Sequence, residues 1–120
     1  MIYSAVSMAR TNPPLAPAAF LILFALADGD KHGYAIMRDA RELSGGHVTI
    51  GPATLYTTIQ RLLESGWIEE VISPKDTDSR RRYYSLTRQG RAVFKKELQR
   101  MEAMVVKSKA MGLRSAEPAS

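Results

Sequence analysis

The chain has 120 residues, no cysteine, and 17 lysine and arginine residues against 12 aspartate and glutamate residues, which gives a net charge of +5. This length fits one domain with a hydrophobic core of its own. The lack of cysteine excludes disulfides, thiolate metal ligands and a cysteine nucleophile, and the positive charge favours a polyanionic partner.

The first part of the chain predicts an arm followed by an apolar helix. Residues 1–14 show no hydrophobic period, so we expect a flexible arm, in which Met8 is an alternative start to Met1. The apolar run 15–27 is too short to span a bilayer. We therefore expect a buried helix over 17–28 rather than a membrane or signal segment, and a cytoplasmic protein. Because this helix is apolar almost all round, it has a second surface to bury, and a partner subunit would cover it.

The middle of the chain has the spacing of a helix-turn-helix. A turn at 28–33 precedes a helix predicted over 34–43, which a serine and two glycines at 44–46 end. The β-branched link 47–50 either adds a strand or sets the angle of the next helix. That next helix occupies 52–66, with proline in its first turn and glycine at its end, and carries an apolar stripe at helical spacing. Two helices joined by a glycine-bearing connection predict a helix-turn-helix.

The polar face of the helix after Pro52 lacks the mixture of glutamate and lysine that an ordinary exposed helix carries. Hydroxyl, amide and guanidinium groups approach phosphates and base edges without filling the major groove, so we interpret this helix as a recognition helix. Tyr56 either contacts DNA or braces the preceding helix, and Arg61 either flanks a phosphate or pairs with Glu64. The candidate DNA-binding residues on this helix are Thr54, Tyr56, Thr57, Thr58, Gln60 and Arg61.

A β-hairpin with a basic return strand is predicted next. The strand over 67–73, the turn over 74–79 and the return strand over 80–86 form this hairpin. Strand alternation sends the middle one of the three arginines that open the return strand to the opposite face. These arginines either protect an edge strand from aggregation or form a wing that contacts the DNA backbone or minor groove. The candidate DNA-binding residues of the hairpin are Lys75, Arg80, Arg81 and Arg82.

A long final helix is predicted over 88–111, capped by Thr87, with a frayed and flexible tail over 112–120. Its apolar residues recur at coiled-coil spacing, and its length exceeds what a small winged core covers, so we expect a homodimer. The methionines either line an adaptable effector pocket or belong only to the seam between subunits. The dimer candidates are Phe20, Leu23, Phe24, Phe94, Leu98, Met101 and Val105, and the effector-pocket candidates are Phe94, Met101 and Met104.

These elements together predict a mainly α fold with a small β-hairpin wing (α+β). A winged helix-turn-helix over 15–87 is followed by the dimerisation helix over 88–111. His32 and His47 lie far apart in a chain without cysteine, which is a poor metal site, and His32 is interpreted as a cap or brace of the second helix. No nucleophile–base set or glycine-rich phosphate loop is present. We therefore expect no cofactor, no metal and no enzyme activity.

Several motifs occur in order between about Leu15 and Met111. They are LxPxxFxIL from Leu15, HGYxI from His32, TLY from Thr54, RLLExGxI from Arg61 and RRRYYxLTxxG from Arg80. Together they resemble the PadR family of transcriptional regulators, in the short form with a single C-terminal helix. Two positions depart from the family pattern. Thr57 stands where proline often follows the tyrosine, and the tryptophan is Trp67 rather than a residue of the last helix.

The resemblance implies a dimeric bacterial repressor whose first and last helices build the dimer contact. Many members respond to small aromatic or amphipathic molecules, so the expected partners are double-stranded DNA, a second copy of the chain and such an effector, with no membrane. We expect a ligand-responsive repressor that binds a pseudo-palindromic operator as a homodimer. The alternatives are a winged helix that binds other proteins, and a small-molecule-binding dimer without a specific operator.

Overall fold

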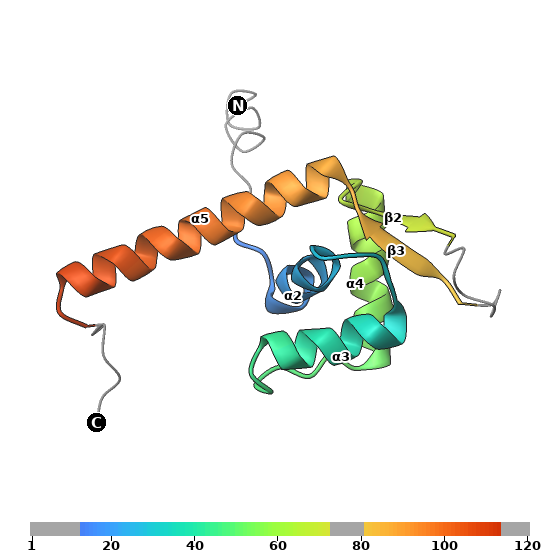
Figure 1. The fold of residues 1–120 in the computed structure, drawn as a ribbon, viewed down its shortest axis with the longest axis horizontal. Coiled ribbons are helices and arrows are strands. Elements are labelled where there is room, and N and C mark those ends of the chain that lie inside the picture. The colour runs from blue at the N-terminus through green and yellow to red at the C-terminus, as the bar shows by residue number, and fades with distance from the viewer. Residues whose placement is uncertain (1–12, 73–80, 114–120) are drawn as a thin grey trace, which may run out of the picture.

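The computed structural model describes residues 13–72 and 81–113 (Figure 1). Most of the predicted arm and tail, and the tip of the hairpin, lie outside these residues. None of the described helices combines the length and apolar character that a membrane span requires. The elements, in chain order, are α2 (Pro17–Leu26), β1 (Lys31–His32), α3 (Gly33–Leu43), α4 (Pro52–Ser65), β2 (Ile68–Val71), β3 (Tyr83–Leu86) and α5 (Arg88–Ala110).

The predicted fold class is confirmed: four helices pack beside a small antiparallel sheet in a winged-helix arrangement within the described residues. The core lies where α2 packs between α3, α4 and α5. The apolar stripe of α4 faces this core, because Leu55, Ile59 and Leu62 are all buried. The largest side chains that are almost completely inaccessible come from four of the elements and are Ile22, Leu23, Leu26, Ile36, Leu55 and Ile68.

The sheet has three strands in the order β1-β3-β2, so the hairpin gains a strand that the sequence did not predict. Residues 31–32 were expected to lie in a turn, but Lys31 pairs with Tyr84 and His32 with Tyr83. The prediction was wrong here because two residues are too few to show a strand period. Residues 47–50 form no strand and serve as the link into α4. The third strand joins the start of α3 directly to the wing.

A corner of short contacts holds α4, β2 and α5 together. Gly66 ends α4 in the left-handed conformation, with φ of 78°, as its sequence position predicted. The Thr87 hydroxyl donates to the carbonyl oxygen of Gly66 at 2.7 Å and accepts from the N–H of Gly90 at 3.0 Å. Gly90 leaves no room for a side chain, because an added Cβ would lie 1.9 Å from the carbonyl oxygen of Trp67. These contacts therefore join the end of α4 to the start of α5.

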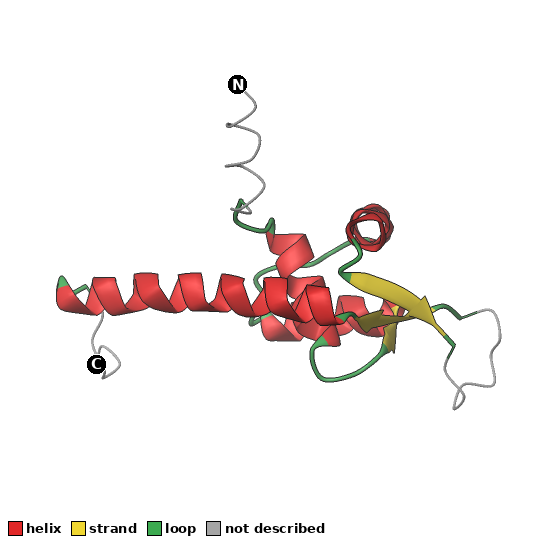
Figure 2. Cartoon of the chain, turned by 90° about the horizontal axis from the view of Figure 1, so that it is seen from above, coloured by secondary structure: helices red, strands yellow, loops and turns green. Residues whose placement is uncertain are grey.

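The helix α5 packs on the domain only through its first half. Its buried residues are Gly90, Phe94 and Glu97. The Glu97 carboxylate accepts from Arg100 Nη2 at 2.6 Å and from the N–H of Leu15 at 3.4 Å, which ties the start of α2 to α5. The second half extends past the remaining helices, away from the strands (Figure 1, Figure 2). This half has no packing partner among the described residues of the same chain.

Candidate nucleic-acid interface

The outer face of α4 is polar and open. Among the six candidate residues on this helix only Thr58 is partly covered; the other five are exposed. Ala53, Thr54, Thr57, Thr58 and Arg61 border a shallow hollow of about 240 Å³. Pro52 begins the helix without a side-chain cap, so its first amides remain open to an acceptor. The face offers hydroxyl and guanidinium groups with no bulky apolar side chain beside the hollow.

The structure distinguishes between the two roles suggested for Arg61, near the end of α4. Gln60 donates from Nε2 to Glu64 Oε2 at 3.4 Å. Arg61 forms no ion pair within the described residues, so Glu64 does not hold it. Arg61 therefore remains available for a phosphate, whereas Gln60 is partly engaged on its own helix.

The described part of the wing brings two arginines beside α3 and α4. Arg81 and Arg82 are exposed and directly precede β3. Arg82 Nε lies 3.7 Å from Glu70 Oε2, a loose pair since the arginine side chain is 72% exposed. Tyr84 behind them is buried, and burial, followed by the charge of Glu70, raises the pKa of its hydroxyl. Lys75 and Arg80, the other wing candidates, lie outside the described residues.

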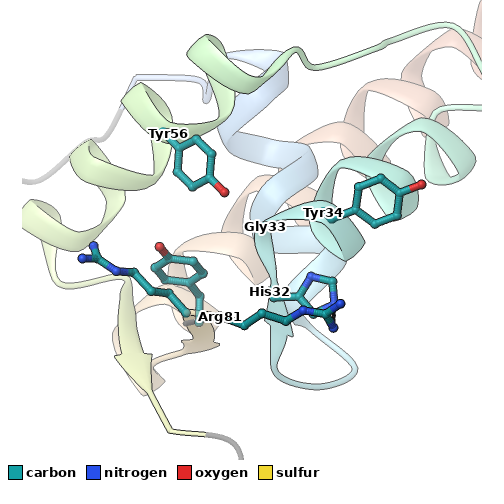
Figure 3. Close-up of a pocket in the computed structure, with 7 residues that line it drawn as sticks. His32, Gly33, Tyr34, Tyr56 and Arg81 are labelled. Atoms are coloured by element: carbon teal, nitrogen blue, oxygen red, sulfur yellow. Dashed lines mark hydrogen bonds between the residues drawn. The ribbon is translucent and has the colours of Figure 1, made fainter. Parts of the chain in front are cut away.

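The recognition helix, the wing and the start of α3 enclose one groove, with a volume of about 530 Å³ (Figure 3). Tyr56 reaches from α4 toward Gly33 of α3, and a Cβ at Gly33 would lie 2.6 Å from its hydroxyl oxygen. With 53% of its surface exposed, Tyr56 both rests on α3 and opens to solvent, so the two roles suggested for it are compatible. The lining residues are His32, Gly33, Tyr34, Tyr56, Arg81, Arg82 and Tyr84. None of these described lining residues carries a carboxylate.

Four lining residues were not among the predicted site residues: His32, Gly33, Tyr34 and Tyr84. His32 caps α3, since its Nδ1 accepts from the N–H of Ala35 at 3.3 Å, which confirms the capping role. Tyr34 is 68% exposed at the first turn of α3. The HGY motif marks the start of α3, but its position beside the wing arginines depends on the pairing of β1 with β3, which the sequence did not show. Lys31, which precedes His32, forms ion pairs with Asp28 and Asp39. The hydrogen bond and charge of Lys31 lower the pKa of Asp28.

The residues predicted for the dimer contact divide into buried and exposed groups. Phe20 and Phe24 are partly exposed, and each ring centroid lies 5.3 Å from that of Phe94, which is itself buried. Leu98 and Val105 are 39% and 37% exposed on α5. Leu23 is a correction to the prediction, because it is 0% exposed and packs in its own core. An all-apolar helix gives no sequence signal for which side faces its own domain.

The three residues suggested for an effector pocket do not converge within one protomer. Phe94 is buried against the rings of α2, whereas Met104 is 59% exposed on the projecting half of α5. Ten residues of α-helix separate them, which is about 15 Å. Any pocket that uses both would need a second chain. Within the described residues no group of histidine and acidic side chains has the arrangement of a metal site.

The family model described as the "Transcriptional regulator PadR-like family" matches residues 22–96, from the core of α2 into α5. The chain belongs to this family. It is a family of transcriptional regulators, which are not enzymes. The match covers α3, α4 and the wing, so the groove and the open face of α4 lie within the matched region.

The chain is also similar to individual proteins. The chain is 36% identical over 92 residues to an uncharacterised 37.1 kDa protein in transposon TN4556 of Streptomyces fradiae; the match covers 77% of this chain but only 24% of that protein. A PadR-family transcription regulator from Clostridium difficile superposes with a TM-score of 0.68 at 22% identity, covering 80% of this chain and 98% of that one. PadR of Bacillus subtilis, solved in complex with operator DNA, gives 0.61 at 23% identity over 72% and 48% of the two chains. These two structures share the fold.

Proposed function

We propose that this PadR-family regulator is a homodimeric repressor that binds a pseudo-palindromic operator. The observation that carries the proposal is the joint surface of α4 and the wing: an open face of hydroxyl groups borders a groove whose described lining residues include two arginines and no carboxylate. Threonine and tyrosine hydroxyls suit phosphates and base edges, and arginines suit the backbone. PadR of Bacillus subtilis, which shares the fold, is known bound to operator DNA.

Each recognition helix would enter a major groove by its N-terminal half. The residues deepest in the groove would then be Thr54, Tyr56, Thr57 and Thr58, and Gln60 and Arg61 would lie nearer the edge of the groove. In such dockings the two half-sites lie about 34 Å apart, or a multiple of that. Arg81 and Arg82 would contact the flanking backbone. Lys75 and Arg80 are proposed as further wing contacts from their sequence position alone. A regulator of this kind works where the chromosome is, in the cytoplasm.

The second copy would cover the apolar surface of α5. Water-exposed apolar residues continue along its projecting half, and surfaces of this kind are typical of protein interfaces. The partly exposed rings of Phe20 and Phe24 extend the same surface onto α2. The residues proposed for the contact are Phe20, Phe24, Phe94, Leu98, Met101, Met104 and Val105, with Phe94 supporting the rings from below.

A small aromatic or amphipathic effector is proposed to act where α2 and α5 of the two copies meet. Aromatic rings and methionines offer an adaptable apolar surface there. The effector must bind one arrangement of the two α4 helices more tightly than the other, because a ligand with equal affinity for both does not shift the equilibrium between them. Operator affinity measured with and without the bound molecule tests this, and a ligand that binds without changing that affinity contradicts it.

The test of DNA binding starts from a random duplex library. Repeated selection at physiological salt should enrich one inverted repeat, and footprinting should show two protected half-sites. No enrichment over the random library would refute a specific operator, and would favour a role in protein–protein contact or small-molecule binding.

Charge-matched variants then locate the contacts. Arg82→Gln should lower affinity and reduce the slope of log affinity against log salt by about one unit for each half-site, since one phosphate contact is lost. Lys96→Gln removes the same charge from the exposed side of α5 and should change little. Equal losses in the two variants would show a general charge effect and contradict the wing assignment.

A further inference from the structure

His32 has an N–H donor beside each of its ring nitrogens. The N–H of Ala35 lies 3.3 Å from Nδ1, and Arg81 Nη1 lies 3.4 Å from Nε2. A neutral imidazole accepts at one nitrogen and donates at the other, and a charged imidazole donates at both. His32 therefore accepts from at most one of these two groups.

Burial decides which of the two contacts is a hydrogen bond. Ala35 is only 8% exposed, and its N–H belongs to the first turn of α3, where amides have no partner within the helix. Arg81 is exposed, so water can hydrate its guanidinium. The structure therefore favours acceptance at Nδ1 and places the ring proton on Nε2. The ring of Tyr83 packs edge-on against His32 at 5.3 Å and holds the imidazole in this orientation.

In this tautomer His32 Nε2 and Arg81 Nη1, which lie 3.4 Å apart, both carry N–H groups that can donate. Two converging donors are complementary to an oxygen anion placed between them. They lie on the groove that Tyr34 and Tyr56 also border (Figure 3). From this geometry we infer that neutral His32 donates from Nε2, together with Arg81, to a phosphate oxygen of the DNA backbone.

This inference rests on the proposed DNA binding and assigns His32 a role beyond capping. The groove chemistry suits a phosphodiester, because its described lining residues offer imidazole, guanidinium and phenol donors and no competing carboxylate. One phosphate held here would lie between the wing and the start of α3, and so would fix the wing relative to the recognition helix. His32 would then both cap α3 and contact the DNA that α4 reads.

Two substitutions separate the capping role from the phosphate contact. Asparagine and aspartate are both good N-cap residues, so His32→Asn and His32→Asp each keep an acceptor for the N–H of Ala35. Asparagine removes the Nε2 donor, and aspartate also introduces a negative charge beside the phosphate. His47, which is exposed on the link before α4, supplies a matched control as His47→Asn. Circular dichroism and thermal melts establish that each variant keeps its fold.

The measurement is the affinity for a labelled mixed-sequence DNA duplex across a series of salt concentrations. His32→Asn should bind roughly tenfold more weakly per protomer engaged, as loss of a hydrogen bond to a charged group implies. Because the lost group is neutral, the salt slope should stay unchanged, whereas Arg81→Gln should lower it by about one unit. His32→Asp should bind more weakly still, and His47→Asn should bind as the unmodified protein does.

The inference would be overturned, with DNA binding left intact, by unchanged affinity of folded His32→Asn or by a proton on Nδ1 of His32 in a long-range ¹H–¹⁵N spectrum. A reduced salt slope for His32→Asn would also overturn it, since that would make His32 a cation. Failure of the unmodified protein to bind the duplex at all would instead refute the proposed function.

Discussion

Gly33→Ala should weaken DNA binding while leaving the fold almost unchanged. The added Cβ would lie 2.6 Å from the hydroxyl oxygen of Tyr56 and 3.2 Å from its Cζ atom. Ordinary contact begins near 3.4 Å, so the hydroxyl must move by about 0.8 Å. Tyr56 is half exposed and its phenol is the far end of a rotatable side chain, so this movement costs little. Alanine in place of glycine at a helical position stabilises by about 0.4–1 kcal/mol, which offsets the remaining crowding.

The same displacement is large for a hydrogen bond. An O–H···O bond near 2.8 Å that lengthens by about 0.8 Å leaves the range in which such bonds form. If Tyr56 donates to a phosphate oxygen, the lost bond is worth about 1.5–3 kcal/mol, which is roughly a tenfold to hundredfold loss of affinity for each protomer engaged. The effect of Gly33→Ala therefore depends on the hydroxyl of Tyr56.

A double-mutant cycle with Tyr56→Phe tests that dependence. Fluorescence anisotropy with the selected operator should show that each single substitution weakens binding and that the double variant is little weaker than either one. Thermal melts should place all the variants near the unmodified protein. Additive losses, or unchanged affinity of Gly33→Ala, would refute the reasoning.

Three further outcomes are expected. Gly90→Ala should destabilise the fold by about 3 kcal/mol or more, because its Cβ would lie 1.9 Å from the carbonyl oxygen of Trp67. Gly51→Ala, with open space around the added Cβ, should cost less than about 1 kcal/mol. Similar melting temperatures for the two variants would contradict this prediction. Leu98→Glu should give monomers in light scattering, and an intact dimer would contradict the proposed seam. Burial raises the pKa of Tyr84, so its contribution to stability is complete below the ordinary tyrosine pKa and is lost as pH rises toward the raised value. Urea unfolding should therefore show a shallower alkaline decline in Tyr84→Phe, and an equal decline would contradict this.

The elements that the sequence predicted well are those with a long period or a specific cap. The stripe of Leu55, Ile59 and Leu62 faces the core as its spacing required, and Gly66 and Thr87 end and begin their helices as expected. Each of these signals depends on neighbours within one or two turns. Local chemistry is sufficient to specify them.

The features that were missed depend on contacts between distant parts of the chain. The strand β1 exists because β3 pairs with it, and a strand of two residues is too short to show a hydrophobic period in the sequence. Leu23 faces its own core although its helix is apolar on every side. The approach of Arg81 to His32 joins residues 49 positions apart. The groove beside α4 was therefore not visible in the sequence, although four of its lining residues lie in the motifs HGY and TLY.

The contacts at Thr87 join α4, the proposed recognition helix, to α5, the proposed dimerisation helix. The Thr87 hydroxyl bridges the end of α4 to the first turn of α5, and Gly90 lets α5 lie against the backbone at Trp67. Because both hydrogen bonds of the Thr87 hydroxyl are of ordinary length, a rotation of α4 relative to α5 would break them. If two copies associate along α5, the angle at which those helices cross sets the separation and tilt of both α4 helices. A ligand bound between the two α5 helices would then affect DNA binding without a rearrangement of the core, because a change in the crossing angle also changes the spacing of the two α4 helices.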